Sequence, residues 1–143
     1  MIEQGAELFD RLVVAIGENP EKRYTYPLDQ RLSWLREATA HVSNVEVKHY
    51  TNLFLATFAS SIGGRFVVRG IRNEADYDYE RAMRYVNSDL HPGLTTVFLM
   101  PPREICEVSS SLVKGMIGTE GWQTIVRKYV PECVFRDLAR SHA

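Results

Sequence analysis

The chain has 143 residues, of which 45% are hydrophobic and 24% are charged, and these proportions are those of an ordinary globular domain. Its 17 basic and 18 acidic side chains leave a net charge of −1, so no overall basic field draws it to nucleic acid or to an acidic membrane. We therefore expect a single domain over residues 1–143, without a nucleic-acid partner, in which any anion site comes from a local cluster.

The sequence carries no targeting signal that we can identify. Residues 1–10 lack the basic start and apolar run of a signal peptide, and no apolar run approaches the roughly 20 residues that span a bilayer. We expect Cys106 and Cys133 to be reduced, structural thiols in a cytoplasmic protein. These observations favour neither a membrane protein nor a disulfide-stabilised one.

Short apolar runs alternate with longer amphipathic segments along the chain. The expected strands comprise residues 12–16, 44–50, 66–68 and 95–100, and the expected helices comprise residues 27–42, 53–62, 74–90, 109–117, 122–130 and 131–139. The first run, LVVAI, is continuous and rich in β-branched residues, which is typical of a strand buried on both faces. This alternation predicts an α/β fold, a parallel sheet with helices on both faces. In such sheets ligands bind beyond the carboxyl ends of the strands.

The first candidate site follows the strand at residues 66–68. Arg69 and Arg72 fall just beyond that strand, and a guanidinium group binds phosphate through two charge-assisted hydrogen bonds at once. Gly70 allows the backbone to approach a bound group closely. The alternative is that the two arginines are solvated and form salt bridges with Glu74 or Asp76.

The second candidate is the run Ser109-Ser110-Ser111, which opens an expected helix. The first N–H groups of a helix lack internal partners and favour anions, and the hydroxyl groups add further donors. The alternative is that a serine simply caps the helix. Together with Arg69 and Arg72, these serines predict a domain that binds a phosphate-rich nucleotide.

Two further groups are weaker candidates. Glu80 lies a full turn beyond the acids that start its helix, so it is too far along to interact with the positive end of the helix dipole. It could instead face the ligand cleft at the strand ends. Lys22 follows the first strand and could offer a mobile positive charge to a phosphate, although a solvated loop lysine is the commoner case. The histidines have no metal-ligand spacing, and no glycine-rich phosphate loop or Cys-x-x-Cys motif is present.

Several of these segments together carry a family resemblance. In chain order they are FDRLVVAIGENP (9–20), NVEV (44–47), VRGIR (68–72), DYDYE (76–80), Asn87, VFLMP (97–101) and SSSLVK (109–114). They closely resemble bacterial phosphopantetheine adenylyltransferases from about Met1 to Pro131. The order of VRGIR, DYDYE and SSSLVK makes the match specific.

The resemblance implies a Rossmann-like nucleotidyltransferase fold and transfer of an adenylyl group from ATP to 4′-phosphopantetheine. The products are dephospho-coenzyme A and pyrophosphate, in coenzyme A biosynthesis. It also implies magnesium with the ATP and a homo-oligomer, often a hexamer. The implied ATP-binding residues are Gly70, Ile71, Arg72, Glu80, Ser109, Ser110 and Ser111, and the implied phosphopantetheine-binding residues are Lys22, Phe54, Leu55, Arg69 and Asn87.

The chain also departs from the family pattern. The family's first strand, which is central in its sheet, and its G-T-F-D-P-x-x-x-G-H stretch have no counterpart from Met1 onward. We expect a segment with that Gly-x-His motif to precede Met1 in the native protein. No catalytic side chain of the family is visible in the sequence, which leaves charge stabilisation by Lys22, Arg72 and Ser110.

Other departures bear on the nucleotide and the tail. Ile105, Cys106 and Glu107 replace residues of the usual adenine pocket, so adenine packing is expected to differ, and Gly115 replaces a commonly acidic residue. The tail at residues 118–129 looks longer than usual.

Two alternatives to this enzyme stay open on the sequence. One is a nucleotide-binding or coenzyme-A-binding module without catalysis. The other is a nucleotidyltransferase with a different phosphorylated acceptor.

Overall fold

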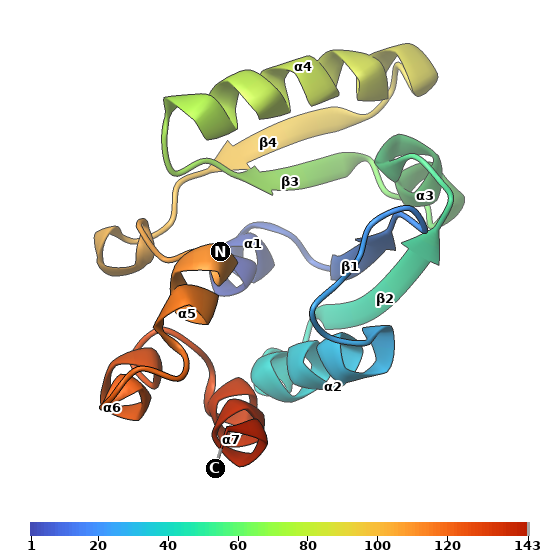
Figure 1. Cartoon of the computed structure of the whole chain (residues 1–143). Coiled ribbons are helices and arrows are strands. Elements are labelled where there is room, and N and C mark those ends of the chain that lie inside the picture. Colours follow the sequence, from blue (N-terminus) through green and yellow to red (C-terminus); the bar gives the residue numbers. More distant parts are fainter. Residues whose placement is uncertain (143) are drawn as a thin grey trace.

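The computed structural model describes residues 1–142 and alternates strands with helices along most of the chain (Figure 1). Its strands are β1 (Leu12–Glu18), β2 (Val45–Thr51), β3 (Phe66–Gly70) and β4 (Thr95–Leu99). Its helices are α1 (Ile2–Leu8), α2 (Leu28–Thr39), α3 (Leu55–Ser61), α4 (Glu74–Leu90), α5 (Ser110–Met116), α6 (Trp122–Val126) and α7 (Glu132–Ser141), with a 3-10 turn η1 at Arg103–Ile105. The predicted α/β class with parallel strands is confirmed.

The strands pair into two separate parallel sheets. β1 pairs with β2, with Leu12 opposite Val45, and β3 pairs with β4, with Phe66 opposite Thr95. Among residues 1–142, β1 and β3 have no second strand partner. A cavity of about 690 Å³ is lined by residues of both, among them Val14 and Val68.

The predicted complete burial of the first strand is wrong. Residues 12–16 are all only partly buried in the structure. The physical reason is that β1 pairs along one edge only, so its other side borders the cavity toward β3. The expectation of a further strand in the native protein stays a prediction.

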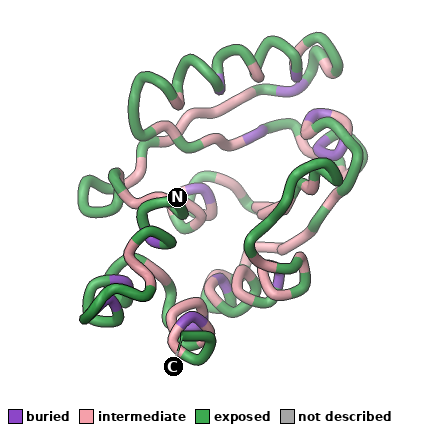
Figure 2. Tube along the Cα trace, in the orientation of Figure 1, coloured by how far each residue is buried: buried purple, intermediate pink, exposed green. Residues whose placement is uncertain are grey.

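The core is divided into two hydrophobic clusters. The first cluster joins α3 to β3 and to the residue before β4, through Ala56, Ala59, Val67 and Leu94. The second cluster joins α5, α6 and α7, through Val113, Trp122, Val126 and Leu138. Figure 2 shows the buried residues as short patches spread over several elements rather than as one block.

Helix α4 lies along the β3–β4 sheet (Figure 1). Its start is fixed by Asn73, whose side chain accepts a hydrogen bond from the backbone N–H of Asp76. Its end lies at Leu90, after which the chain turns into β4. On the other sheet, α2 packs against β2 and α7 packs against α2. No helix within residues 1–142 has both the length and the apolar character needed to cross a membrane.

Helix α1 was not predicted from the sequence. Its seven residues are too few to show a clear period, and Gly5 lowers their helix propensity. Gly5 has a packing role, because a Cβ there would lie 3.2 Å from Cδ2 of Leu12 in β1. The helix is therefore held by its contact with β1 rather than by its own propensity.

Candidate functional site

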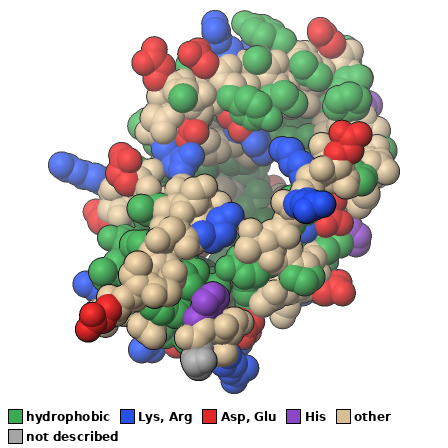
Figure 3. All heavy atoms as spheres, in the orientation of Figure 1, with side chains coloured by type: hydrophobic (Ala, Val, Ile, Leu, Met, Phe, Trp, Pro, Cys, Tyr) green, Lys and Arg blue, Asp and Glu red, His purple; other side chains and the backbone are tan. Residues whose placement is uncertain are grey.

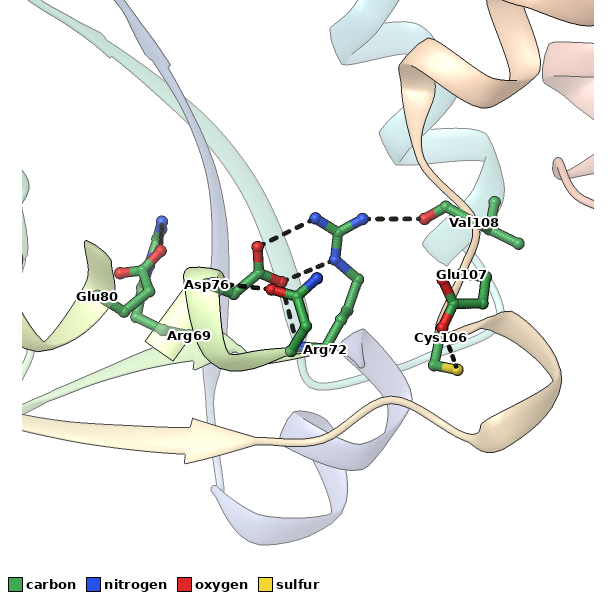
Figure 4. A network of polar contacts seen from close by, with 8 residues as sticks. Arg69, Arg72, Asp76, Glu80, Cys106, Glu107 and Val108 are labelled. Carbon is green, nitrogen blue, oxygen red and sulfur yellow. Dashed lines mark hydrogen bonds and ion pairs between the residues drawn. The ribbon is translucent and has the colours of Figure 1, made fainter. Parts of the chain in front are cut away.

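The site is built at the carboxyl end of β3, where the chain leaves the sheet and enters α4. Arg69 belongs to β3, and Arg72 lies in the short connection that follows it. Asp76 and Glu80 are one turn apart on α4, so they lie on the same face of that helix. Figure 4 shows that each arginine has one of these two acids as its partner.

Arg69 and Glu80 form the more buried of the two ion pairs. Nε of Arg69 donates to Oε2 of Glu80 at 2.8 Å, and Nη2 donates to Oε1 of the same carboxylate. The Glu80 side chain is 10% exposed and that of Arg69 is 40% exposed. The hydrogen bonds from Arg69 to Glu80 raise the pKa of Arg69 above its ordinary value, although burial acts against this. The guanidinium is therefore charged and held in one orientation.

Arg72 and Asp76 form a more exposed ion pair. Nε of Arg72 donates to Oδ2 of Asp76 at 2.8 Å, and Nη2 donates to Oδ1 at 3.2 Å. The third guanidinium nitrogen, Nη1, donates to the carbonyl oxygen of Val108 at 3.3 Å. The hydrogen bond with Arg72 holds the pKa of Asp76 below its ordinary value. Arg72 thus connects the start of α4 to the residue that precedes Ser109.

The serine run opens α5 as predicted. Ser109 is the N-cap, and its hydroxyl accepts a hydrogen bond from the backbone N–H of Leu112 at 3.1 Å. Ser110 and Ser111 occupy the first turn. A cavity of about 460 Å³ is lined by Ser109, Ser110 and Lys114 together with aromatic side chains that include Tyr24 and Trp34. Capping accounts for Ser109, whereas the hydroxyls of the other two serines have no capping role.

The predicted phosphopantetheine-binding residues other than Arg69 are dispersed along the chain. Lys22 is exposed in the loop after β1, where its backbone N–H donates to the carbonyl of Asn19. Phe54 precedes α3 and is 58% exposed, whereas Leu55 packs against the first hydrophobic cluster. Asn87 is 4% exposed on α4, and within residues 1–142 its Oδ1 has no partner.

The sequence suggested that Gly70, at the end of β3, lets the backbone approach a bound ligand, but in the structure a side chain of the protein lies there. A Cβ on Gly70 would lie 3.1 Å from Cε of Met1, so the group that approaches this glycine is the Met1 side chain. The backbone N–H of Ile71 donates to the carbonyl of Leu99 and continues the β3–β4 pairing. Seen from outside, several Lys and Arg side chains gather around a hollow on one face (Figure 3).

Sequence reasoning missed Tyr50 at the end of β2. Its ring stacks on Phe58 with 4.5 Å between centroids, and its hydroxyl lies over the end of β1, because a Cβ on Gly17 would meet it at 2.6 Å. Burial raises the pKa of Tyr50, and the charge of Arg69 acts in the opposite direction. The rule that ligands bind beyond strand ends would have included this residue, since Tyr50 lies near the end of an expected strand.

Residues 105–107, which precede the serines, are those that differ from the usual adenine pocket of the family. The η1 turn ends at Ile105, which is 43% exposed, and Cys106 donates a weak hydrogen bond to Glu107 at 3.7 Å. The pKa of Arg72 is raised mainly by its hydrogen bonds to Asp76, and the negative charge of Glu107 adds a smaller contribution (Figure 4). Its effect on adenine packing stays a prediction. Cys106 and Cys133 are free thiols.

Comparison with known proteins extends the resemblance to nearly the whole chain. A family model described as cytidylyltransferase-like matches residues 1–116. The chain is 52% identical, over 138 residues, to a protein of Chromobacterium violaceum named phosphopantetheine adenylyltransferase, and the alignment covers 96% of this chain and 84% of that protein. It is 49% identical, over 142 residues, to a protein of the same name from Neisseria meningitidis serogroup C, with 99% and 84% covered.

Proposed function

The chain belongs to the phosphopantetheine adenylyltransferase family, within the cytidylyltransferase-like group, and from this we propose that it transfers the adenylyl group of ATP to 4′-phosphopantetheine. The products are dephospho-coenzyme A and pyrophosphate, in coenzyme A biosynthesis. The structural observation that supports this is the pair of charged guanidinium groups at the carboxyl end of β3. Two guanidinium groups give each of the two phosphate-bearing substrates one charged, bidentate donor.

In the proposed reaction, a phosphate oxygen of 4′-phosphopantetheine attacks the α-phosphorus of ATP. A new P–O bond forms, the bond from the α-phosphorus to the pyrophosphate oxygen breaks, and no covalent enzyme intermediate is needed. The protein's contribution is to position the two substrates and to stabilise the charge that develops on the α-phosphate. Lys22, Arg72 and Ser110 are the residues of this chain that we assign to that stabilisation.

We assign the two arginines to different substrates. Arg69 and Lys22 would hold the phosphate of phosphopantetheine, and Arg72, with Ser110 and Ser111, would hold the phosphates of ATP. The link from Arg72 to the residue before Ser109 supports the second assignment, because it brings a guanidinium to the start of α5. The remaining proposed contacts are Gly70, Ile71 and Glu80 for ATP, and Phe54, Leu55 and Asn87 for the pantetheine arm.

Magnesium would enter the site with ATP. Within residues 1–142, no group of three or more His, Cys, Asp or Glu side chains could hold a metal ion. The two acids nearest the site, Asp76 and Glu80, are each bonded to an arginine. These residues do not form a metal cage, and Mg²⁺ commonly binds through the phosphates of its nucleotide with few protein ligands. MgATP is therefore the substrate that we propose.

We also propose that the protein is a cytoplasmic homo-oligomer, with a hexamer as the specific expectation. Helix α4 exposes Tyr79, Val86 and Leu90, which are spaced at seven and four residues and so lie on one side of the helix. An exposed apolar stripe of this kind is typical of a surface that a partner covers. Light scattering coupled to size-exclusion chromatography would measure the mass in solution.

The decisive experiment measures ligand binding and pyrophosphate release on the same preparation. We expect pyrophosphate only when ATP and 4′-phosphopantetheine are both present, and none when CTP replaces ATP or pantetheine replaces its phosphate ester. Calorimetry should show binding of both substrates. Binding without any turnover would support the non-catalytic module instead, and binding of neither substrate would reject the proposed function.

A further inference from the structure

The loop of residues 19–27 joins β1 to α2 and carries Lys22 near its middle. These residues, all of which the structure describes, form turns and bends rather than a helix or a strand, and most of them are exposed. A backbone of this kind has many conformations unless specific contacts limit it, and ordering it when a ligand binds costs conformational entropy. The position of the Lys22 ammonium group therefore depends on the contacts that hold the loop.

The first part of the loop, residues 19–24, forms a closed turn. The backbone N–H of Asn19 donates to the hydroxyl of Tyr24 at 2.9 Å. Asn19 in turn accepts from two backbone N–H groups: its carbonyl accepts from Lys22 at 3.0 Å, and its Oδ1 accepts from Glu21 at 2.9 Å. Lys22 thus lies between Asn19 and Tyr24, whose hydrogen bond joins the two ends of this turn.

Arg31 connects the loop to α2. Its Nη2 donates to Oε1 of Glu18, the last residue of β1, at 2.7 Å, and its Nε donates to the carbonyl of Tyr26 at 3.1 Å. Its guanidinium carbon lies 4.2 Å from the centre of the Tyr24 ring, within the distance of a cation–π contact. The side chains of Arg31 and Glu18 are 19% and 22% exposed, so solvent screens this pair less than it screens a surface pair. One arginine therefore contacts the residue before the loop and two residues within it.

The second part of the loop packs on α2 and touches α5. The ring of Tyr26 lies edge-on against Trp34 of α2, with 4.9 Å between centroids. Oγ1 of Thr25 accepts from Nζ of Lys114 at 3.4 Å. Thr25 and Tyr26 also line the same cavity of about 460 Å³ as Ser110. The loop that carries Lys22 is thus in contact with the helix that begins with the serine run.

From these contacts we propose that Arg31 and Tyr24 are positioning residues for Lys22. They hold the loop backbone in one conformation, so the Lys22 ammonium group meets the phosphate of 4′-phosphopantetheine from an ordered loop. Less conformational entropy is then lost when the phosphate binds. The inference rests on the proposed function, in which Lys22 binds that phosphate, and it adds two residues to which the sequence assigned no role.

A direct effect of the Arg31 charge on the phosphate predicts a different pattern. Arg31→Met removes a positive charge together with the loop contacts, so this variant alone does not separate the two effects. Tyr24→Phe separates them, because it keeps every charge and the aromatic ring and removes only the hydroxyl that accepts from Asn19. Attraction by charge alone leaves Tyr24→Phe equal to wild type, whereas positioning weakens binding in both variants.

The test measures dissociation constants of 4′-phosphopantetheine and pantetheine by calorimetry. For Tyr24→Phe and for Arg31→Met we expect the constant for 4′-phosphopantetheine to rise about three- to tenfold, the range for loss of one hydrogen bond. The constant for pantetheine, which lacks the phosphate, should change less than about twofold. Arg136→Met is the matched control, because Arg136 pairs with Glu37 on the same helix α2 but is 44% exposed. It should leave both constants unchanged.

A double-mutant cycle with Lys22→Ala tests whether the effect passes through Lys22. In the Lys22→Ala background, Tyr24→Phe and Arg31→Met should cause almost no further loss of 4′-phosphopantetheine affinity. Losses of equal size with and without Lys22 would overturn the proposal. Equal losses of pantetheine and 4′-phosphopantetheine affinity would also overturn it, because they would indicate a structural role only. Wild-type affinity in Tyr24→Phe would leave Arg31 acting by charge and would reject positioning.

Hydrogen exchange in the unliganded protein gives a readout that needs no substrate. The amide protons of Asn19 and Lys22 should exchange faster in Tyr24→Phe than in wild type, while those of β2 should not change. Unchanged exchange at Asn19 and Lys22 would contradict the proposal, because Tyr24 would then not order the loop. Tyr24→Phe changes one exposed hydroxyl, so it decides the outcome even if Arg31→Met fails to fold. An inactive wild type that binds both substrates would reject the proposed reaction, while the binding constants would still decide the roles of Arg31 and Tyr24.

Discussion

Arg69 and Arg72 lie three residues apart in the chain and are both paired with an acid of α4, yet their surroundings differ. Arg69 is half-buried, bonds Glu80 through one edge, and has a second side that faces outward. The Arg72 side chain is about as exposed, but its acid is less buried, with Asp76 24% exposed against 10% for Glu80. Each of the three guanidinium nitrogens of Arg72 has a partner, two on Asp76 and one on Val108.

The difference predicts two kinds of binding. A phosphate can reach Arg69 without breaking an existing contact, so this arginine is organised before the ligand arrives. In Arg72 only the second N–H of Nη1 and of Nη2 is left for a phosphate, and a closer contact would replace the bond to Val108 or the bonds to Asp76, which are individually weak. The buried Glu80 therefore keeps Arg69 in one orientation, whereas a bound phosphate can replace the more exposed Asp76 as the partner of Arg72.

The largest effect is expected from breaking the buried pair. Arg69→Ala should lower the free energy of unfolding by about 1–3 kcal/mol, because the carboxylate of Glu80 is left buried without its partner. It should also weaken 4′-phosphopantetheine binding. Urea denaturation at neutral pH and calorimetry measure the two effects, and Arg81→Ala serves as an exposed control. Stability equal to wild type would show that the Arg69 pair is as dispensable as a surface pair.

Breaking the exposed pair should affect binding rather than stability. We expect Arg72→Ala to raise the ATP dissociation constant about 10- to 100-fold, the range for losing a hydrogen bond to a charged group. The unfolding transition should move little, since exposed ion pairs contribute little to stability. Calorimetric titration with ATP and a thermal melt on the same sample measure both quantities. Unchanged ATP affinity would identify Arg72 as a structural link between α4 and Val108.

The serines next to Val108 allow the same contrast to be tested within one helix. Ser109→Ala should destabilise the protein by about 0.5–2 kcal/mol, because it removes the cap of α5. Ser110→Ala should leave stability nearly unchanged and should weaken ATP binding. Thermal unfolding of both variants with and without ATP separates these effects. If Ser110→Ala gains the full stabilisation that ATP gives to wild type, Ser110 has no part in binding the nucleotide.

The smallest effect is expected from titrating the exposed pair. The pKa of Asp76 is lowered in the folded protein by its bonds with Arg72. The stability that this pair contributes is therefore complete above the ordinary pKa of 3.8 and is lost as the pH falls through the lower, folded value. We expect wild type and Asp76→Asn to differ more in melting temperature at pH 6 than at about pH 3. A difference that grows toward acid pH would contradict this sign.

Local signals in the sequence predicted most of the elements. Helix α4 was predicted at residues 74–90, as observed, because the segment is long and a clear turn follows Leu90. Its cap at Asn73 was not predicted. The strands were predicted to within about two residues, because each apolar run ends at a clear turn. Helix α1 and the η1 turn were not predicted, because they are too short to show a helical period of hydrophobic residues. The ends of α2 and α6 also fall short of their predicted limits.

The site was predicted as a set of residues but not as a set of contacts. Salt bridges from the two arginines to Glu74 or Asp76 were a stated alternative, and the structure shows one of them, Arg72 with Asp76. Pairing of Arg69 with Glu80 was not foreseen, since it crosses from a strand to a helix and depends on how α4 packs on β3. The capping of α5 by Ser109 was also a stated alternative. Spacing along the chain identifies which side chains are neighbours within one element. Contacts between side chains of different elements depend on how those elements pack.

The division of the core into two clusters has a consequence for hydrogen exchange. Arg69 belongs to β3, which the first cluster includes, and Arg72 follows that strand, whereas the serines begin α5, a helix of the second cluster. Clusters of this kind often open as separate cooperative units, each with its own opening free energy. A nucleotide bound by Arg72 and Ser110 at once would join the two units, so its binding energy would oppose the opening of either one. Amide protons of α6, a helix to which we assign no substrate contact, would then exchange more slowly in the presence of ATP.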